Sequence, residues 1–137
     1  MDPSSLPPGF EKHARRSGLT DPWEPLYSRH LADAVYLGWW AGPAHANSRG
    51  RVHGGLLTAL ADNAMGLSCA QVSGESVGLV TVNLGMDFVA AARMGQWIEI
   101  RPTVVKAGRQ LSFASALVLA DERICARAHA TFQAVAR

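Results

Sequence analysis

Asp62 is the side chain in this sequence whose surroundings most strongly suggest chemistry. It lies within Leu56–Gln71, a stretch free of proline and rich in alanine and leucine, which predicts a helix. The stretch is apolar nearly all round and should be buried, and an unpaired buried carboxylate is costly. Asp62 could therefore be a general base or a nucleophile, or it could cap a neighbour or reach solvent at a helix edge. Thr58, one turn earlier on the same face, could hydrogen-bond it.

The residues just before this helix, His53-Gly54-Gly55, offer a second chemical function. Paired glycines permit a sharp entry into the helix and a close approach by a ligand. The first helical turn carries unpaired N–H groups and a partial positive charge, which can bind an anion or stabilise an oxyanion. Paired glycines before helices are common, however, and His53 and Asn47 taken alone could be ordinary loop and turn residues.

The strands that must support this helix follow from hydrophobic periodicity. Alternation of apolar and polar residues is the pattern of a strand with one apolar face. In Val80–Phe88 and in Ile124–Val135 the even-numbered residues form the predicted apolar face. The predicted strands are residues 34–41, Val80–Phe88, Trp97–Val105, Leu111–Leu119 and Ile124–Val135.

Tight turns at Ala107-Gly108 and Asp121-Glu122 would make successive strands antiparallel neighbours. The predicted order is therefore one strand, the helix, and then a meander of four strands. One long buried helix wrapped by an antiparallel sheet of about five strands is an α+β architecture. Because a single sheet covers only one side of an all-apolar helix, we expect a second subunit on the other side.

The first 33 residues differ in composition from the rest of the chain. They contain five of the seven prolines, which interrupt regular structure. We interpret residues 1–33 as a lead-in with one short helix, roughly Pro8 to Ser17, and a proline-rich loop. Residues 34–137 then form a single domain, as expected for a chain of 137 residues.

Composition and charge exclude several classes of protein. With 48% hydrophobic and 18% charged residues, the chain can build a packed core. Its net charge of +2 is too balanced for a nucleic-acid-binding surface. No stretch is long enough to span a membrane and no secretory signal is evident, so a cytoplasmic location is expected. Cys69 and Cys125 lack metal-binding spacing, and we expect reduced thiols and no metal site.

The motifs together resemble a known family. Val52-His53-Gly54-Gly55 followed by Ala61-Asp62-Asn63-Ala64 resembles the hot-dog-fold acyl-CoA thioesterases, in particular those of the phenylacetate-degradation type. The similarity spans about residues 36 to 135 and includes residues 80–88 and 105–109. It implies a hot-dog fold and hydrolysis of a small aryl- or medium-chain acyl-CoA to the free acid and CoA. It also implies that no bound cofactor is needed, since CoA is part of the substrate.

The resemblance also implies a role for five residues. Asp62 matches the carboxylate that activates the attacking water or attacks the thioester directly. Gly54 matches the residue whose backbone N–H polarises the thioester carbonyl, and Asn47 matches a side chain that assists it. His53 matches a neighbour that shapes the same loop. Thr81 falls where relatives place a hydroxyl that holds the nucleophilic water.

These roles carry a geometric consequence. Gly54 and Asp62 are eight residues apart, about 12 Å along a helix axis, whereas reacting groups must lie within roughly 3–3.5 Å. One chain cannot therefore supply both groups to the same thioester. Two antiparallel helices from two subunits could, so we predict a composite site in a homodimer at minimum, and we expect a dimer of dimers, that is, a homotetramer.

Three basic residues on predicted turns are candidate contacts for the phosphates of CoA, although each could also be an ordinary solvated charge. They are Arg93, Lys106 and Arg109.

Two other functions remain open. One is a non-catalytic acyl-CoA-binding module, although such regulators carry a DNA-binding segment for which 137 residues leave no space. The other is a hot-dog dehydratase or hydratase, which resembles a pattern with Asp and His a few residues apart. Here His53 precedes Asp62 by nine residues, which disfavours that chemistry.

Overall fold

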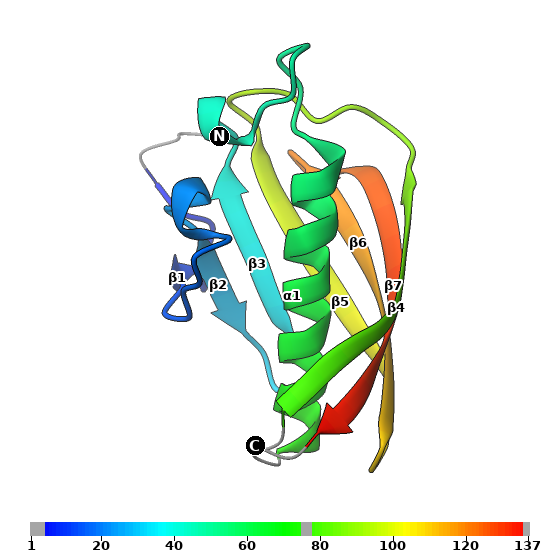
Figure 1. Cartoon of the computed structure of the whole chain (residues 1–137). Helices are drawn as coiled ribbons and strands as arrows, with labels where there is room; N and C mark the ends of the chain where they lie inside the picture. The colour runs from blue at the N-terminus through cyan, green and yellow to red at the C-terminus, as the bar shows by residue number, and fades with distance from the viewer. Residues whose placement is uncertain (1–4, 75–77, 136–137) are drawn as a thin grey trace.

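One helix packs across a single seven-stranded antiparallel sheet in the computed structural model, which describes residues 5–74 and 78–135. Figure 1 shows the helix α1 (Gly54–Ser73) lying along one face of the sheet, whose strand order is β1-β2-β3-β5-β6-β7-β4. The α+β hot-dog architecture is therefore confirmed, with seven strands rather than about five. The strands are β1 (Glu11–Lys12), β2 (Tyr27–His30), β3 (Val35–Trp40), β4 (Gly78–Phe88), β5 (Trp97–Ala107), β6 (Leu111–Ala120) and β7 (Arg123–Val135); two short 3-10 helices are η1 (Asp21–Trp23) and η2 (Pro43–His45).

The predicted helix is confirmed and extends two residues further at each end. It begins after His53, whose Nδ1 accepts the Gly55 N–H at 2.8 Å as an N-cap. It ends at Gly74, which has the left-handed conformation (φ 66°) that glycine adopts without strain. One side of the helix is buried against the sheet; this side consists of Leu56, Leu57, Leu60, Ala61, Ala64, Met65, Ser68 and Cys69.

The expectation that the helix is buried all round is wrong for the single chain. Asn63 and Gln71 are exposed, and Asp62 is half-buried between them and the core. One sheet covers one side of a helix, so a stripe of α1 is left for solvent or for another surface. Asp62 lies on this stripe.

The N-terminal segment contains no helix between Pro8 and Ser17 where one was predicted. Instead, β1 and β2 extend the sheet, and β2 pairs with β3 from Tyr27↔Gly38 to His30↔Val35. The segment lacks a helical apolar stripe, and its one buried aromatic, Phe10, packs edge-on against Trp97 with ring centroids 5.2 Å apart. Burial of that ring on the sheet face away from α1 favours the extended chain over a helix.

The predicted meander is correct for β5, β6 and β7 and wrong for β4. The turn residues Asp121 and Glu122 have positive φ, as a tight hairpin requires. In contrast, β4 pairs with β7 and lies at the sheet edge. Residues 89–96, which follow β4, are too long for a tight hairpin, and Figure 1 shows this connection passing over the start of α1 to reach β5.

A β-bulge in β4 changes which of its side chains face the helix. Thr81 pairs with Phe132 and Asn83 with Thr131, so Val82 is an extra residue. Leu79 before the bulge and Leu84 after it both pack against the core. The predicted apolar face of even-numbered residues is therefore wrong before the bulge: Val80 and Val82 are 49% and 52% exposed.

Two residues of the predicted apolar faces are also exposed elsewhere in the sheet. Phe88, at the end of β4, is 53% exposed. A shift in the pairing of β6 with β7 leaves Ile124 exposed and buries Cys125 instead. Cys69 and Cys125 are both free thiols, as expected, and burial raises the pKa of Cys69 to about 11.

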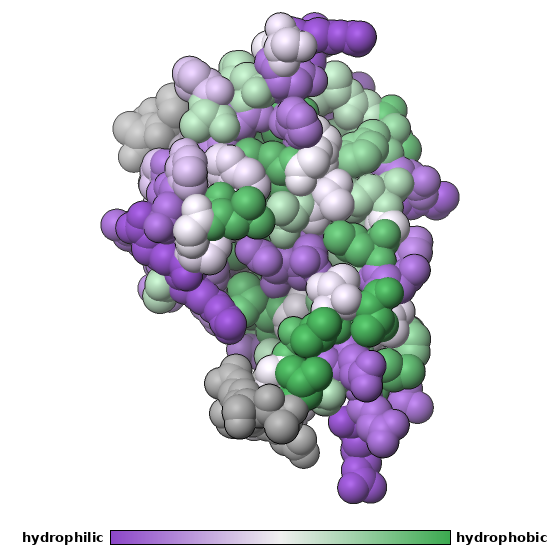
Figure 2. Space-filling model, in the orientation of Figure 1, coloured by the Kyte–Doolittle hydropathy of each residue, from purple (hydrophilic) through white to green (hydrophobic). Residues whose placement is uncertain are grey.

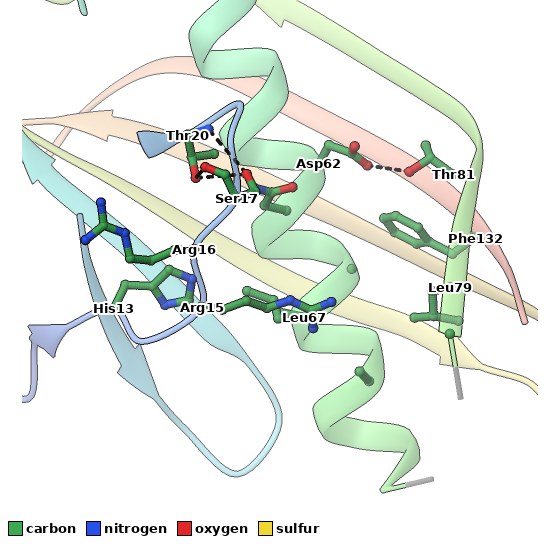
Figure 3. Close-up of a pocket in the computed structure, with 14 residues that line it drawn as sticks. His13, Arg15, Arg16, Ser17, Thr20, Asp62, Leu67, Leu79, Thr81 and Phe132 are labelled. Carbon is green, nitrogen blue, oxygen red and sulfur yellow. Dashed lines mark hydrogen bonds between the residues drawn. The ribbon is translucent and has the colours of Figure 1, made fainter. Parts of the chain in front are cut away.

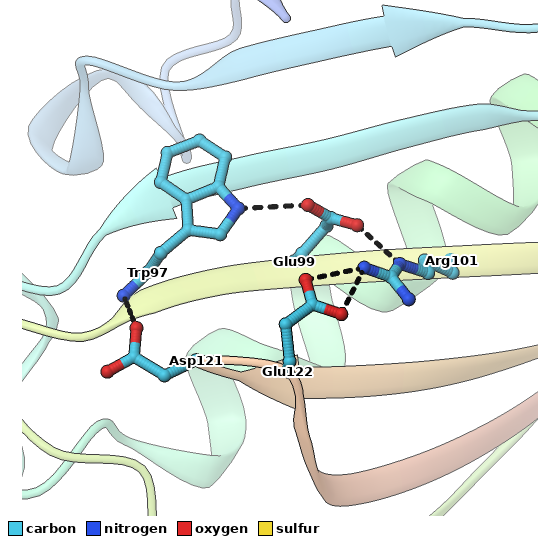
Figure 4. A network of polar contacts seen from close by, with 5 residues as sticks. All are labelled: Trp97, Glu99, Arg101, Asp121 and Glu122. Carbon is cyan, nitrogen blue, oxygen red and sulfur yellow. Dashed lines mark hydrogen bonds and ion pairs between the residues drawn. The ribbon is translucent and has the colours of Figure 1, made fainter. Parts of the chain in front are cut away.

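A buried carboxylate lies on the sheet face away from α1, and Figure 4 shows how it is paired. The Trp97 indole N–H donates to Glu99 at 2.9 Å, and Arg101 forms a close ion pair with the other oxygen of Glu99. Arg101 also donates to both oxygens of the exposed Glu122, at 2.8 and 3.0 Å. The Glu99 side chain is 6% exposed, so Arg101 is its charge partner.

This network predicts unequal effects of two substitutions on stability. Arg101→Met leaves the Glu99 charge buried and uncompensated, which should lower the free energy of unfolding by about 3 kcal/mol. Glu122→Gln removes only a solvent-screened pair and should cost less than about 1 kcal/mol. Urea denaturation measures both. Equal losses would contradict the assignment, and the double variant Arg101→Met, Glu99→Leu should recover stability because no buried charge is left unpaired.

Candidate active site

The Asp62 carboxylate is held by a hydroxyl from a distant part of the chain. Thr81 Oγ1 donates to Asp62 Oδ1 at 2.7 Å, so the third turn of α1 is joined to the first part of β4 (Figure 3). The bulge at Val82 makes this possible, because it lets Thr81 face the helix on the same side as Leu84 further along the strand. Asp62 Oδ2 has no hydrogen-bond partner in the described residues and is available to a water or substrate.

Thr58 makes no hydrogen bond to Asp62 in the described structure, contrary to expectation. Its hydroxyl donates to the carbonyl oxygen of Gly54 at 2.8 Å, four residues back in the same helix. Threonine hydroxyls in helices commonly bond to this carbonyl, which competes with other partners on the same face. The hydroxyl that bonds to Asp62 therefore comes from Thr81 on the sheet and not from Thr58 on the helix.

A cavity of about 610 Å³ opens beside Asp62. Its floor is the exposed stripe of α1, and one wall is apolar and comes from Leu79 and Phe132 of the sheet. The opposite wall comes from the N-terminal segment, as Figure 3 shows. The residues that line the cavity are His13, Arg15, Arg16, Ser17, Thr20, Asp62, Asn63, Gly66, Leu67, Ala70, Gly78, Leu79, Thr81 and Phe132.

The N-terminal wall of this cavity is not predicted by the sequence. The basic residues near position 15 are visible in the sequence. Nothing local indicates that they lie over the helix, because their position depends on β1 pairing with β2 and β2 with β3.

The start of α1 has a backbone N–H group that could donate a hydrogen bond to an oxygen atom of a ligand. His53 Nδ1 caps the Gly55 N–H, while the Gly54 N–H makes no hydrogen bond within the described residues. The Phe88 ring lies against Gly54, since a Cβ built on Gly54 would be 3.2 Å from Phe88 Cζ. Gly54 therefore has a free N–H in a close-fitting environment, next to the N-cap residue His53.

Asn47 organises the loop before the helix. Its Oδ1 accepts the N–H groups of Arg49 and Arg51 at 2.9 and 3.0 Å. This is the turn role that the residue type alone indicates. The side-chain NH₂ of Asn47 makes no hydrogen bond within the described residues, so it is available to a ligand.

The three predicted phosphate contacts lie at two ends of the sheet. Arg93 forms a β-bridge with Arg51, beside the loop that leads into α1. Lys106 and Arg109 lie at the turn between β5 and β6, about 30 Å away along β5. One CoA molecule could not contact Arg93 and these two residues of the same chain.

Two further tests concern metals and membranes. No group of three or more His, Cys, Asp or Glu side chains in residues 5–74 and 78–135 is arranged to hold a metal ion. None of the helices in these ranges is long and apolar enough to cross a membrane.

Comparison with known proteins identifies the family. The family model described as the thioesterase superfamily matches residues 49–127, which include the helix, Asp62 and Thr81. The chain belongs to the thioesterase superfamily. The predicted resemblance and the assignment as a thioester hydrolase are thus confirmed.

Two relatives illustrate the range of sequence similarity. The "Putative esterase PA0474" of Pseudomonas aeruginosa is 36% identical over 129 residues, covering 93% of this chain and 96% of the relative. Human acyl-coenzyme A thioesterase 13 is 34% identical over 73 residues, covering 52% of this chain and 50% of the relative.

Solved structures confirm the fold. A hypothetical thioesterase from Streptococcus pneumoniae, crystallised with coenzyme A, has a TM-score of 0.75 at 20% identity, covering 84% of this chain and 92% of that one. The N33D mutant of the phenylacetic acid degradation protein PaaI from Thermus thermophilus has a TM-score of 0.72 at 24% identity, covering 80% and 93%. The phenylacetate-degradation type is therefore one of several structural neighbours of this superfamily member.

The Thr81–Asp62 bond predicts a graded effect on thioester hydrolysis. Thr81→Val removes the hydroxyl and should lower kcat by about tenfold or more, since positioned proton-transfer groups contribute about 10²–10⁴. Thr81→Ser keeps the hydroxyl and should keep most of the activity. Thiol release from acyl-CoA esters measures both, with thermal melting as the folding control. Equal activity of the valine and serine variants would remove the hydroxyl from the mechanism.

Proposed function

We propose that the protein hydrolyses a small aryl- or medium-chain acyl-CoA to the free acid and CoA. The observation that carries this proposal is the Asp62 carboxylate, oriented by Thr81 and open to a cavity of about 610 Å³. Similarity to human acyl-coenzyme A thioesterase 13 and to the streptococcal thioesterase crystallised with coenzyme A supports CoA thioesters as the substrate class. The cavity is large enough for an acyl group of this size and has an apolar wall.

The proposed chemistry needs no metal or bound cofactor. The thioester carbonyl oxygen accepts the free Gly54 N–H, assisted by the Asn47 NH₂ group and the partial positive charge of the helix start. On the general-base route, Asp62 takes a proton from water as the water oxygen attacks the carbonyl carbon, and the carbon–sulfur bond then breaks. On the nucleophilic route, the Asp62 carboxylate attacks the carbonyl carbon, the carbon–sulfur bond breaks to give an anhydride, and water then hydrolyses the anhydride. On both routes the CoA thiolate leaves and is protonated.

The helix geometry requires two subunits for this reaction, and the edge strand β4 supplies a way to join them. Within the described residues, β4 pairs only with β7, so one side of an 11-residue strand has unpaired backbone groups. Val72, Val80 and Val82 are exposed near it, and Figure 2 shows apolar surface gathered over β4 and the end of α1. An exposed apolar edge strand is suited to pairing with a second copy.

Pairing of β4 with β4 of a second copy would also complete the site. On one chain, Thr81 near one end of β4 contacts Asp62, and Phe88 at the other end lies against Gly54. A two-fold axis near the middle of β4 pairs the Thr81 end of one copy with the Phe88 end of the other. The helix start of the second copy is thereby carried toward Asp62. A dimer of dimers and a cytoplasmic location remain predictions.

The phosphates of CoA are proposed to bind near the helix start. Arg93, with Arg51 beside it across the β-bridge, supplies positive charge at this end of the sheet. The same two-fold axis turns the β5–β6 turn of the second copy toward this end, so Lys106 and Arg109 contribute from that copy.

Substitution of Asp62 tests the proposed function. Asp62→Asn should lower thiol release by at least about 10² across a panel of acyl- and aryl-CoA esters, because the neutral amide cannot accept a proton. Asp87→Asn is the matched control, since Asp87 is exposed and pairs with Arg127 at 2.8 Å. Equal turnover by Asp62→Asn would remove Asp62 from its role. Binding of acyl-CoA esters without turnover by the native protein would identify a binding module.

Mixed dimers test whether the site is composite. Gly54→Pro deletes the free N–H at the first helical position, where the backbone favours proline, and the extended conformation of His53 (φ −67°, ψ 130°) suits a residue before proline. The added Cβ would lie 3.2 Å from Phe88 Cζ, so this exposed ring has to shift slightly to accommodate it. Asp62→Asn and Gly54→Pro homodimers should each be inactive. After random mixing, about half of the dimers are heterodimers. In a composite arrangement, one site of each heterodimer carries both substitutions and the other carries neither, so the mixture should regain about a quarter of the native activity.

Mass spectrometry of the native complex should first demonstrate that heterodimers have formed. If the mixture then regains no activity, Gly54 and Asp62 of one chain serve the same site. A strictly monomeric protein with full activity would equally contradict the composite arrangement.

A further inference from the structure

The N-terminal segment is fixed over the cavity beside Asp62. The His13 N–H donates to the Leu26 carbonyl at 2.9 Å, which continues the pairing of β1 with β2. Further along, the Asp21 N–H donates to the Ser17 carbonyl at 2.9 Å, and the Thr20 N–H donates to Ser17 Oγ at 3.3 Å. These bonds hold residues 13–20 as a defined wall of the cavity.

His13 brings an unused polar atom to this wall. The residue is only 8% exposed, and its Nδ1 is buried without a hydrogen-bond partner in the described residues. Burial lowers the pKa of His13. The negative charge of Glu24 raises this pKa to a smaller extent, and the positive charges of His30 and Arg15 lower it further. Buried polar atoms without a partner are uncommon and call for a water or a ligand, and a neutral imidazole can donate one hydrogen bond.

Arg15 brings an unpaired charge to the same wall. Its neighbour Arg16 is tied to Asp21 at 3.0 Å, whereas Arg15 has no carboxylate partner in the described residues. Figure 3 shows the Arg15 side chain reaching across the cavity toward Leu67 and the helix. Asp62 is the one acidic residue that lines the cavity within the described chain. The cavity therefore has Asp62 at one end, an apolar body, and a basic wall.

We infer that the preferred substrate carries a second acidic group on its acyl chain, a terminal carboxylate bound by Arg15 and His13. This inference rests on the proposed function of Asp62. The substrate class is the monothioester of a short dicarboxylic acid with CoA. Its methylene chain contacts Leu67, Leu79 and Phe132, and its distal carboxylate accepts hydrogen bonds from the Arg15 guanidinium and His13 Nδ1.

The length of the cavity favours an acyl carboxylate over the phosphates of CoA. Leu67 follows Asp62 by five residues, about 7.5 Å along the helix axis. The pantetheine arm places the phosphates much further than this from the thioester. The basic residues beside the helix start, Arg93 and Arg51, are better placed for them. The wall formed by His13 and Arg15 therefore belongs to the acyl side of the thioester.

Substrate pairs of equal chain length test the inference. Glutaryl-CoA is compared with pentanoyl-CoA, and adipyl-CoA with hexanoyl-CoA, by kcat/KM for thiol release. For the native protein, kcat/KM should be higher for the carboxylated member of each pair by on the order of tenfold to a hundredfold. This is the factor that a charge-assisted hydrogen bond typically contributes. Arg15→Gln should bring this ratio close to one. Lys12→Gln is the matched control, because it removes a charge from the same segment on an exposed residue that does not line the cavity.

The possible outcomes separate this inference from the proposed function. Equal or faster hydrolysis of the uncharged esters by the native protein would overturn the inference and leave the thioesterase function intact. An equal loss on all four esters in Arg15→Gln, with weaker inhibition by free CoA, would assign Arg15 to the CoA phosphates and also overturn it. If no ester is hydrolysed, the proposed function fails, and calorimetric binding of the same ester pairs decides the inference. His13→Phe should reduce the preference independently of Arg15.

Discussion

A straight α-helix fixes the distance between its first turn and its third, and the rest of this structure depends on that distance. The free N–H of Gly54 and the carboxylate of Asp62 are the two groups on α1 suited to thioester hydrolysis, and eight residues separate them by about 12 Å. The helix is packed along one side against the sheet, so it cannot bend to bring them together. A substrate that reaches Asp62 would therefore lie on the exposed stripe of α1. The start of α1 from a second subunit would have to approach the same surface.

The edge strand β4 contacts both the first turn of this helix, through Phe88, and its third turn, through Thr81. Its bulge at Val82 allows Thr81 to reach Asp62, while Leu84 and Met86 beyond the bulge remain on the core. Without the extra residue, the alternation of the strand would place either Thr81 or the core residues on the wrong face. The bulge also leaves Val80 and Val82 exposed at the sheet edge. One local irregularity therefore both orients the carboxylate and leaves an apolar edge suited to a second copy.

The sequence predicts those parts of the structure that depend on local patterns. Leu56–Gln71 is a helix because alanine and leucine favour it, and His53 with Gly54 and Gly55 begins it as the motif indicates. The hairpins through Gly108 and Asp121 follow from short turns. The neighbour of β4, the face shown by Val80 and the position of His13 could not be predicted in this way. Each depends on pairing between residues distant in the chain, and one inserted residue reverses a strand's pattern. Thr81 was assigned by family resemblance, and its contact with Asp62 needed the three-dimensional structure.

In the proposed site, the cavity beside Asp62 separates the groups for chemistry from the groups that recognise the substrate. Asp62 and Thr81 are held by the helix and the sheet, and their positions depend on the core. The wall with His13 and Arg15 is held by the two-residue strand β1 and a few backbone hydrogen bonds. Changes in this segment can therefore alter the charge and shape of the cavity without moving the carboxylate. Under the proposed mechanism, the N-terminal segment could therefore change the acyl specificity while the reaction at Asp62 stays the same.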